Sequence, residues 1–200
     1  MAEPRDTFLE AAEAFADLVA RLRVDLGGPG SPGLGDWDLR ALVGHTSRSL
    51  VTVSTYLGRA ADAVEVPSAA AYFLAVRELA AGPEVTERGR QAGEVLGADP
   101  AAVVRRLLET VADDLVAASE DQLLTTVAGG MRLRDYLPTR TFELVVHGSD
   151  IATATGLDWT PPADALAETV GLAGEIALAS GAGLDLLRQL TGRGGEVRVL

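Results

Sequence analysis

The residues best suited to metal or proton chemistry in this sequence are its two histidines, His45 and His147. The chain contains no cysteine, which excludes thiolate metal ligands, a cysteine nucleophile and disulfides. Glu143 precedes His147 by four residues, so on a helix the two side chains project from one face, about one turn apart. This spacing predicts a carboxylate and an imidazole near enough to hold one divalent ion.

His45 lies far from this pair in the sequence, on the flank of the apolar stripe of another predicted helix. Such flanking positions can point into the space between the helices of a bundle, where metal sites are built from facing side chains. If His45 faces Glu143 and His147, the resulting set of two imidazoles and one carboxylate suits zinc, and also nickel, iron or manganese. Three protein ligands leave a coordination position open. Arg140 and Asp150 fall on the same face of the later helix.

The same residues also have a purely structural interpretation. Glu143 and His147 can form an ordinary surface pair, with Arg140 adding a second surface ion pair. His45 can be a half-buried histidine that bonds to a carbonyl group. Because a glutamate four residues before a histidine often arises by chance, spacing alone favours this structural interpretation.

Three other patterns are assigned no chemistry. Residues 28–33 match G-x-G-x-x-G, but they follow a predicted helix and include two prolines, which indicates a loop. Ser149 and Asp150 follow His147 closely in the sequence, yet neighbours on one helix cannot adopt the geometry of a catalytic triad. Trp37 is expected to act as a hydrophobic staple at the start of the next helix, with stacking against a ligand as the alternative.

Helices are the elements predicted to position these residues. Apolar residues recur at intervals of three and four, and aromatic residues make up only 4% of the chain. The second helix is predicted to start at an Asp36 or Asp38 cap and to continue to about Leu57. Residues 27–36 are predicted to form a loop, and residues 121–133 a small hairpin or an extended loop. The other predicted helices cover residues 6–26, 68–80, 84–96, 100–119, 134–155, 161–180 and 183–191.

The predicted fold class is all-α. Four of the helices are long, so the economical architecture is a four-helix bundle with additional short helices, in one domain covering residues 1–200. Pro138 lies near the start of the helix predicted over 134–155, and it is expected to lie in the first turn, where a proline is tolerated.

The amino-acid composition and net charge exclude several classes of protein. With 200 residues, 48% of them hydrophobic and 23% charged, the chain is expected to be globular and to bury its own core. It has no lysine, so all 17 basic residues are arginines, which excludes Schiff-base catalysis. A net charge of −12 argues against general nucleic-acid binding. No signal peptide or membrane span is recognisable, and a cytoplasmic protein that binds neither nucleic acid nor membrane is expected.

Two segments carry a family resemblance. WDLRALVGHTSR, at 37–48, and YLPTRTFELVVHGSDIATATG, at 136–156, together resemble the DinB/YfiT-like superfamily, and within it the N-terminal metal-binding domain of mycothiol-dependent maleylpyruvate isomerases. The specificity lies in pairing a W-x-x-x-x-L-x-x-H helix with a later R-x-x-E-x-x-x-H-x-x-D helix. The resemblance extends from Thr7 to about Arg193 and implies a DinB-like four-helix bundle that holds a divalent metal, usually zinc.

The resemblance also implies roles for individual residues. His45, Glu143 and His147 match the metal ligands, and Arg140 and Asp150 match positions that orient the ligands or contact an anionic group. The implied activity is that of a thiol-dependent isomerase or S-transferase, in which the metal activates mycothiol as co-substrate for reaction with an electrophile. A homodimer is expected by analogy. The alternative is a non-catalytic bundle that binds a metal, a small ligand or a partner.

The C-terminus departs from the family pattern. The related isomerases carry a further C-terminal domain that supplies basic contacts to the thiol and the substrate. This chain ends at Leu200 and is expected to lack that domain. A single-domain S-transferase is therefore an expected activity in addition to the isomerase.

Overall fold

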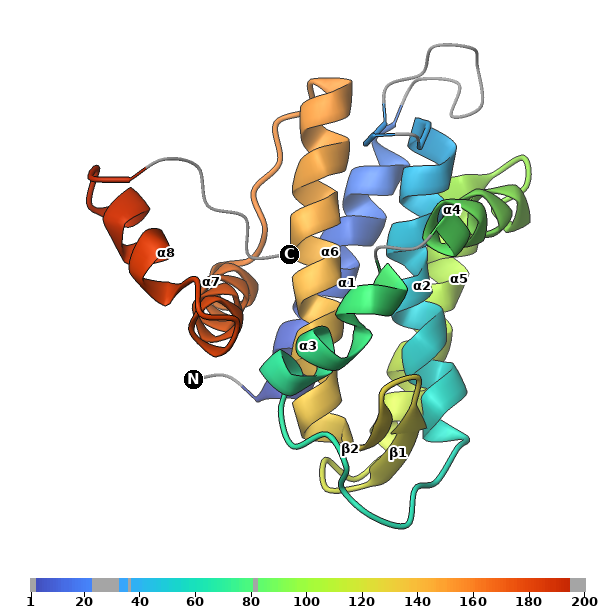
Figure 1. The fold of residues 1–200 in the computed structure, drawn as a ribbon. Coiled ribbons are helices and arrows are strands. Elements are labelled where there is room, and N and C mark those ends of the chain that lie inside the picture. Colours follow the sequence, from blue (N-terminus) through green and yellow to red (C-terminus); the bar gives the residue numbers. More distant parts are fainter. Residues whose placement is uncertain (1–2, 23–32, 36, 81–82, 195–200) are drawn as a thin grey trace.

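The chain folds into eight helices and one short hairpin within the residues that the computed structural model describes, which are 3–22, 33–35, 37–80 and 83–194. Figure 1 shows these elements in chain order. They are α1 (Pro4–Ala20), α2 (Leu39–Leu57), α3 (Ala69–Ala80), α4 (Pro83–Val95), α5 (Pro100–Val116), β1 (Leu123–Thr126), β2 (Gly129–Arg132), α6 (Leu133–Thr155), α7 (Ala163–Ala179) and α8 (Gly183–Leu190). The predicted all-α class is confirmed.

The core lies among four long helices. α1 and α2 each pack against both α5 and α6 (Figure 1), which gives the predicted four-helix bundle. The shorter helices are attached outside, with α4 on α2, α3 on α6, α7 on α6 and α8 on α7. Large apolar side chains spaced by three and four fill the centre, including Phe8, Phe15, Leu42, Leu50 and Leu115, none of which is exposed.

The start of α2 is fixed by its cap. The Asp38 side chain accepts a hydrogen bond from the backbone N–H of Ala41 at 2.7 Å, as predicted for this helix. The alternative cap, Asp36, lies outside the described residues. This cap sets the register of α2 and therefore the face on which His45 projects.

Two glycines let α4 lie directly on α2. A Cβ atom at Gly44 would lie 2.2 Å from the backbone nitrogen of Gly93, so only glycine permits this approach. Because Gly44 immediately precedes His45, the close contact places α4 beside the turn of α2 that carries His45.

The segment before α6 is a hairpin. β1 and β2 pair antiparallel, so the predicted hairpin is observed, but its turn is formed by residues 127 and 128. Gly129 and Gly130 belong to β2. The backbone N–H of Leu133 donates to the carbonyl of Gln122 at 2.9 Å, which joins the first residue of α6 to the hairpin.

The expectation that Pro138 lies in the first turn of its helix is wrong. Pro138 lies inside α6, which begins at Leu133, and therefore beyond the first turn. A proline there leaves the Arg134 carbonyl without its usual helical donor. The helix continues because Leu137 and Phe142, on either side of the proline, are buried in the core.

Two helix ends also differ from expectation. α1 ends at Ala20 and not at residue 26, and α5 ends at Val116 and not at residue 119. Most of the loop predicted over 27–36 lies outside the described residues. Among the helices that the structure describes, none combines the length and apolarity needed to cross a membrane.

Candidate metal centre

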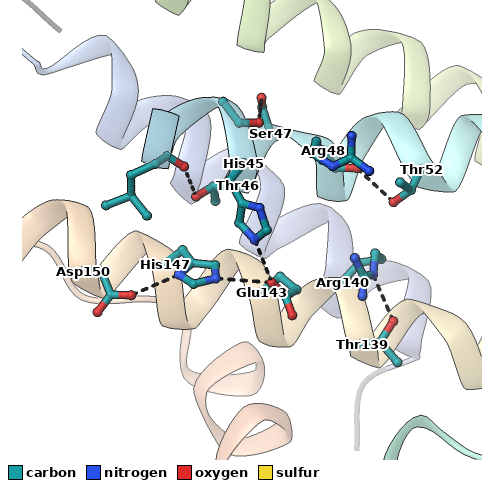
Figure 2. A network of polar contacts seen from close by, with 12 residues as sticks. His45, Thr46, Ser47, Arg48, Thr52, Thr139, Arg140, Glu143, His147 and Asp150 are labelled. Carbon is teal, nitrogen blue, oxygen red and sulfur yellow. Dashed lines mark hydrogen bonds and ion pairs between the residues drawn. The ribbon is translucent and has the colours of Figure 1, made fainter. Parts of the chain in front are cut away.

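Three side chains from two helices meet at one point between α2 and α6. His45 comes from α2, and Glu143 and His147 come from α6 (Figure 2). The Oε2 atom of Glu143 lies 3.6 Å from Nε2 of His45 and 3.3 Å from Nε2 of His147. One ligand atom of each residue lies within 4.8 Å of the other two. The structure therefore brings together the three residues that the sequence selected as ligands.

The spacing of these atoms fits a divalent ion. Zinc binds imidazole nitrogen at about 2.0–2.1 Å, and donors around a tetrahedral ion are then about 3.3 Å apart. The two measured separations, 3.3 and 3.6 Å, lie close to that value. The three side chains are 16–20% exposed, so an ion and a further ligand can reach them.

Asp150 fixes the ring of His147. Its Oδ2 atom lies 3.0 Å from Nδ1 of His147, the ring nitrogen that faces away from Glu143. When Nδ1–H donates to this carboxylate, the lone pair of Nε2 points toward Glu143 and can bind a metal. Asp150 therefore contacts one of the three converging side chains, at a position that the resemblance associates with orienting the ligands or contacting an anionic group.

The electrostatics of the centre keep Glu143 ionised. Burial alone would raise the pKa of Glu143, but hydrogen bonds from His147 and His45 and the charge of Arg140 hold it well below its usual range. Burial lowers the pKa of His147, yet the contacts with Asp150 and Glu143 outweigh burial and raise it to about 9. The centre therefore keeps a carboxylate anion facing its imidazoles.

His45 is held differently from His147. Burial is the largest influence on its pKa, which lies below the usual value although the hydrogen bond with Glu143 acts in the opposite direction. Its second ring nitrogen, Nδ1, is buried and has no hydrogen-bond partner among the described residues. The ring instead lies against Trp37, with centroids 4.4 Å apart.

Trp37 is a site residue whose contacts the sequence did not reveal. The sequence predicts a staple at the start of α2, whereas the structure places the indole beside both imidazoles, at 4.4 Å from His45 and 6.4 Å from His147. A tryptophan shortly before a histidine carries no signal about where its ring points.

Arg140 lies one turn before Glu143 on α6, and its side chain is half-buried. Its Nε atom donates to Oγ1 of Thr139 at 3.0 Å, and its guanidinium lies over the rings of Tyr72 and Tyr136, at 5.4 and 5.2 Å. The alternative in which Arg140 forms a surface ion pair is wrong, since no carboxylate lies within ion-pair distance of it in the described part of the chain.

Arg48 is a second arginine near the centre, and the sequence analysis missed it. It follows His45 by three residues on α2, is half-buried and forms no ion pair with any described residue. Figure 2 shows Arg48 and Arg140 on the side of Glu143 that lies away from Asp150. The sequence offers one indication of this position: Arg48 follows the candidate ligand His45 by three residues, which places both on one face of a helix.

The fold and the site define a helical-bundle protein with a candidate divalent-metal centre between two of its long helices. A sequence model described as the mycothiol maleylpyruvate isomerase N-terminal domain matches residues 8–152, and the chain belongs to this family. The match reaches from α1 into α6 and includes all three converging residues, while α7 and α8 lie beyond it. No curated protein and no solved structure matches the chain.

Proposed function

We propose that this chain binds a divalent metal through His45, Glu143 and His147 and uses it to activate mycothiol for reaction with an electrophile. The observation that supports this most directly is the meeting of the three ligand atoms within 4.8 Å. Membership of the mycothiol maleylpyruvate isomerase family supports a thiol co-substrate. Zinc is the proposed metal because the donor set and spacing suit it, although the same donors also accept nickel, iron or manganese.

The chain supplies the surroundings in which this chemistry would occur. When bound, the metal would provide a Lewis acid that lowers the pKa of an incoming thiol. The thiol has to come from outside because the chain has no cysteine. Asp150 would keep His147 oriented with Nε2 toward the centre, through the 3.0 Å contact with Nδ1.

Arg140 would contact an anionic group of the substrate. A guanidinium carries five N–H donors, and among the described residues one acceptor, Thr139, is found for them. Tyr72 and Tyr136 flank the guanidinium and limit its movement. The reaction with the electrophile would then be either isomerisation of a conjugated double bond or transfer of the thiol.

Metal content is the first test. Protein purified without chelator should contain about one divalent ion per chain. Glu143→Gln should lose it, whereas Glu175→Gln, which changes an exposed glutamate of α7, should retain it. A wild-type protein that takes up no divalent metal would overturn the proposal.

Activity requires a separate test. The metal-loaded protein, incubated with mycothiol and a bimane electrophile, should consume thiol faster than the metal-free protein. A cis-configured conjugated keto acid, added in place of the bimane, distinguishes the isomerase from the S-transferase. Equal rates with and without metal would favour the alternative of a non-catalytic bundle that binds a metal or a small ligand.

A further inference from the structure

The two candidate histidine ligands are oriented by different means. A metal-binding histidine normally donates its second ring N–H to a carboxylate or a carbonyl, which fixes the orientation of the ring. His147 follows this rule through Asp150, at 3.0 Å. The Nδ1 atom of His45 is buried without such a partner in the described part of the chain. Another contact must therefore hold the His45 ring.

Trp37 provides that contact. Its ring centroid lies 4.4 Å from that of His45, with the two planes inclined by 34°, so the indole covers one face of the imidazole. The same indole meets His147 edge-on, at 6.4 Å and 73°. The contact with His45 is the closer one and involves the ring that lacks a hydrogen bond at Nδ1.

The indole also lies close to α4. Gly89 of α4 is buried, and a Cβ atom there would lie 2.8 Å from both Cε2 and Nε1 of Trp37. α4 itself rests on α2 through the backbone contact of Gly44 with Gly93. The half-buried Trp37 ring therefore lies against the backbone of α4 as well as against the imidazole of His45.

We propose that Trp37 is a positioning residue: clamped by Gly89, its indole fixes the His45 imidazole with Nε2 directed at the metal centre. Aromatic packing would thus perform at His45 the task that the Asp150 hydrogen bond performs at His147. This inference rests on the proposed function, in which both histidines bind the metal. It adds the expectation that metal affinity depends on an aromatic ring that binds no metal itself.

The first measurement uses metal-free protein. Because the chain has two histidines, its ¹H NMR spectrum holds two sets of imidazole resonances, and His147→Gln assigns them. The ring current of Trp37 should shift the His45 resonances upfield, and Trp37→Leu should abolish this shift. Trp159→Phe is the matched control, since Trp159 makes no ring contact with either histidine, and it should leave the shift in place.

The second measurement is the affinity for Zn²⁺, determined by competition with a chromophoric chelator. Trp37→Leu should bind Zn²⁺ about tenfold or more weakly than wild type, in the range known for residues that orient ligands. Trp37→Phe, which retains an aromatic face, should recover most of the affinity, and Trp159→Phe should leave it unchanged. Loss of packing alone would give similar losses for Trp37→Phe and Trp37→Leu, and that result would overturn the proposal.

A glycine variant tests the clamp without removing the indole. Gly89→Ala should displace the ring, move the His45 resonances and weaken Zn²⁺ binding. Gly174→Ala is the control, since nothing lies within 4 Å of a Cβ atom there. Unchanged resonances or unchanged affinity in both Trp37→Leu and Gly89→Ala would overturn the positioning role while the proposed function stands. If wild type binds no Zn²⁺, the proposed function fails, and so does a positioning role that depends on it.

Discussion

Asp150 decides which nitrogen of His147 faces the centre. Its carboxylate lies 3.0 Å from Nδ1, so the neutral ring would keep its proton on that nitrogen, and Nε2 would bind a metal once it has lost its own proton. The carboxylate also makes the imidazole a better donor to a cation, because it stabilises the positive charge that develops on the ring. The orientation and the basicity of one candidate ligand therefore depend on a residue outside the set of three that would bind a metal.

The first prediction concerns Asp150→Asn. The amide cannot stabilise the ring in the same way, so the affinity for Zn²⁺ should fall about 10- to 100-fold, while saturating metal still loads one ion per chain. Chelator competition measures the affinity. Asp164→Asn, an exposed position at the start of α7, should bind Zn²⁺ as wild type does, and an equal loss there would show that the effect is one of net charge.

Part of the site was predictable at this scale. Glu143 and His147 are four residues apart, and the helix period alone places them on one face. The selection of His45 depended on the resemblance, since a flanking position on one helix does not determine what faces it. The contact of Trp37 with His45 depends on where α4 lies, and Arg48 lies on the same side of Glu143 as Arg140 because of how α2 and α6 pack. Neither feature can be predicted from the spacing of residues along a single helix.

At the scale of elements, the position of the site depends on how closely α4 approaches α2. Gly44 and Gly93 meet backbone to backbone, and Gly44 directly precedes His45. Any side chain at Gly44 would separate the two helices. The contact therefore links the stability of the fold to the geometry of the turn that carries His45.

The second prediction follows from this contact. Gly44→Ala places a Cβ atom 2.2 Å from the Gly93 nitrogen, which backbone atoms can relieve only by moving apart. It should lower the free energy of unfolding by about 1–3 kcal/mol and weaken metal binding as well. Gly171→Ala, in open space on α7, should instead be neutral or stabilise the protein by up to about 1 kcal/mol. Denaturant melts of both variants provide the comparison.

The third prediction concerns Glu168, at the contact of α7 with α6. Burial raises the pKa of this carboxyl, although a hydrogen bond with Thr141 opposes the rise, and its Oε1 atom is buried without a partner in the described residues. With the pKa raised in the folded state, the protonated form is favoured by folding. The ionised form therefore costs stability at pH 7, and this cost disappears as pH falls through the raised pKa.

Glu168→Gln should accordingly raise the free energy of unfolding at pH 7, by at most about 1 kcal/mol because part of the side chain meets water. The difference from wild type should shrink by about pH 4, where the wild-type carboxyl is itself protonated. Glu175→Gln, which removes an exposed carboxylate from the same helix, is the control for the change of charge. A gain for Glu168→Gln that persists at pH 4 would contradict the assignment to ionisation.

The elements themselves followed closely from amphipathic spacing, because burying an apolar stripe is a local requirement of each helix. Where the structure differs from these predictions, the cause lies in contacts with distant parts of the chain. Pro138 is accommodated inside α6 because the flanking residues are fixed in the core and Leu133 is bonded to the hairpin. The hairpin turn falls at residues 127 and 128 because Gly130 is needed in the strand, where a Cβ atom would meet the carbonyl of Ala63 at 2.0 Å.

At the scale of the whole molecule, the candidate centre joins two helices that are far apart in sequence. α2 and α6 are both part of the bundle core, and the Thr52 and Tyr136 hydroxyls also connect them, at 3.0 Å. A metal held by His45 from one helix and by Glu143 and His147 from the other would act as a cross-link. It would exist only in the folded state, because the unfolded chain does not hold the three residues together.

The last prediction is therefore a thermal one. A ligand that binds only the folded state stabilises it by about 2.7 kcal/mol when its free concentration is 100 times Kd, which corresponds to about 5–10 °C in Tm for a chain of this size. Zn²⁺ should raise the Tm of the metal-free protein by this amount, and the rise should grow with Zn²⁺ concentration. His147→Ala should show no such rise, while Asp150→Asn should show it at higher Zn²⁺. An equal rise in His147→Ala would place the ion elsewhere on the molecule.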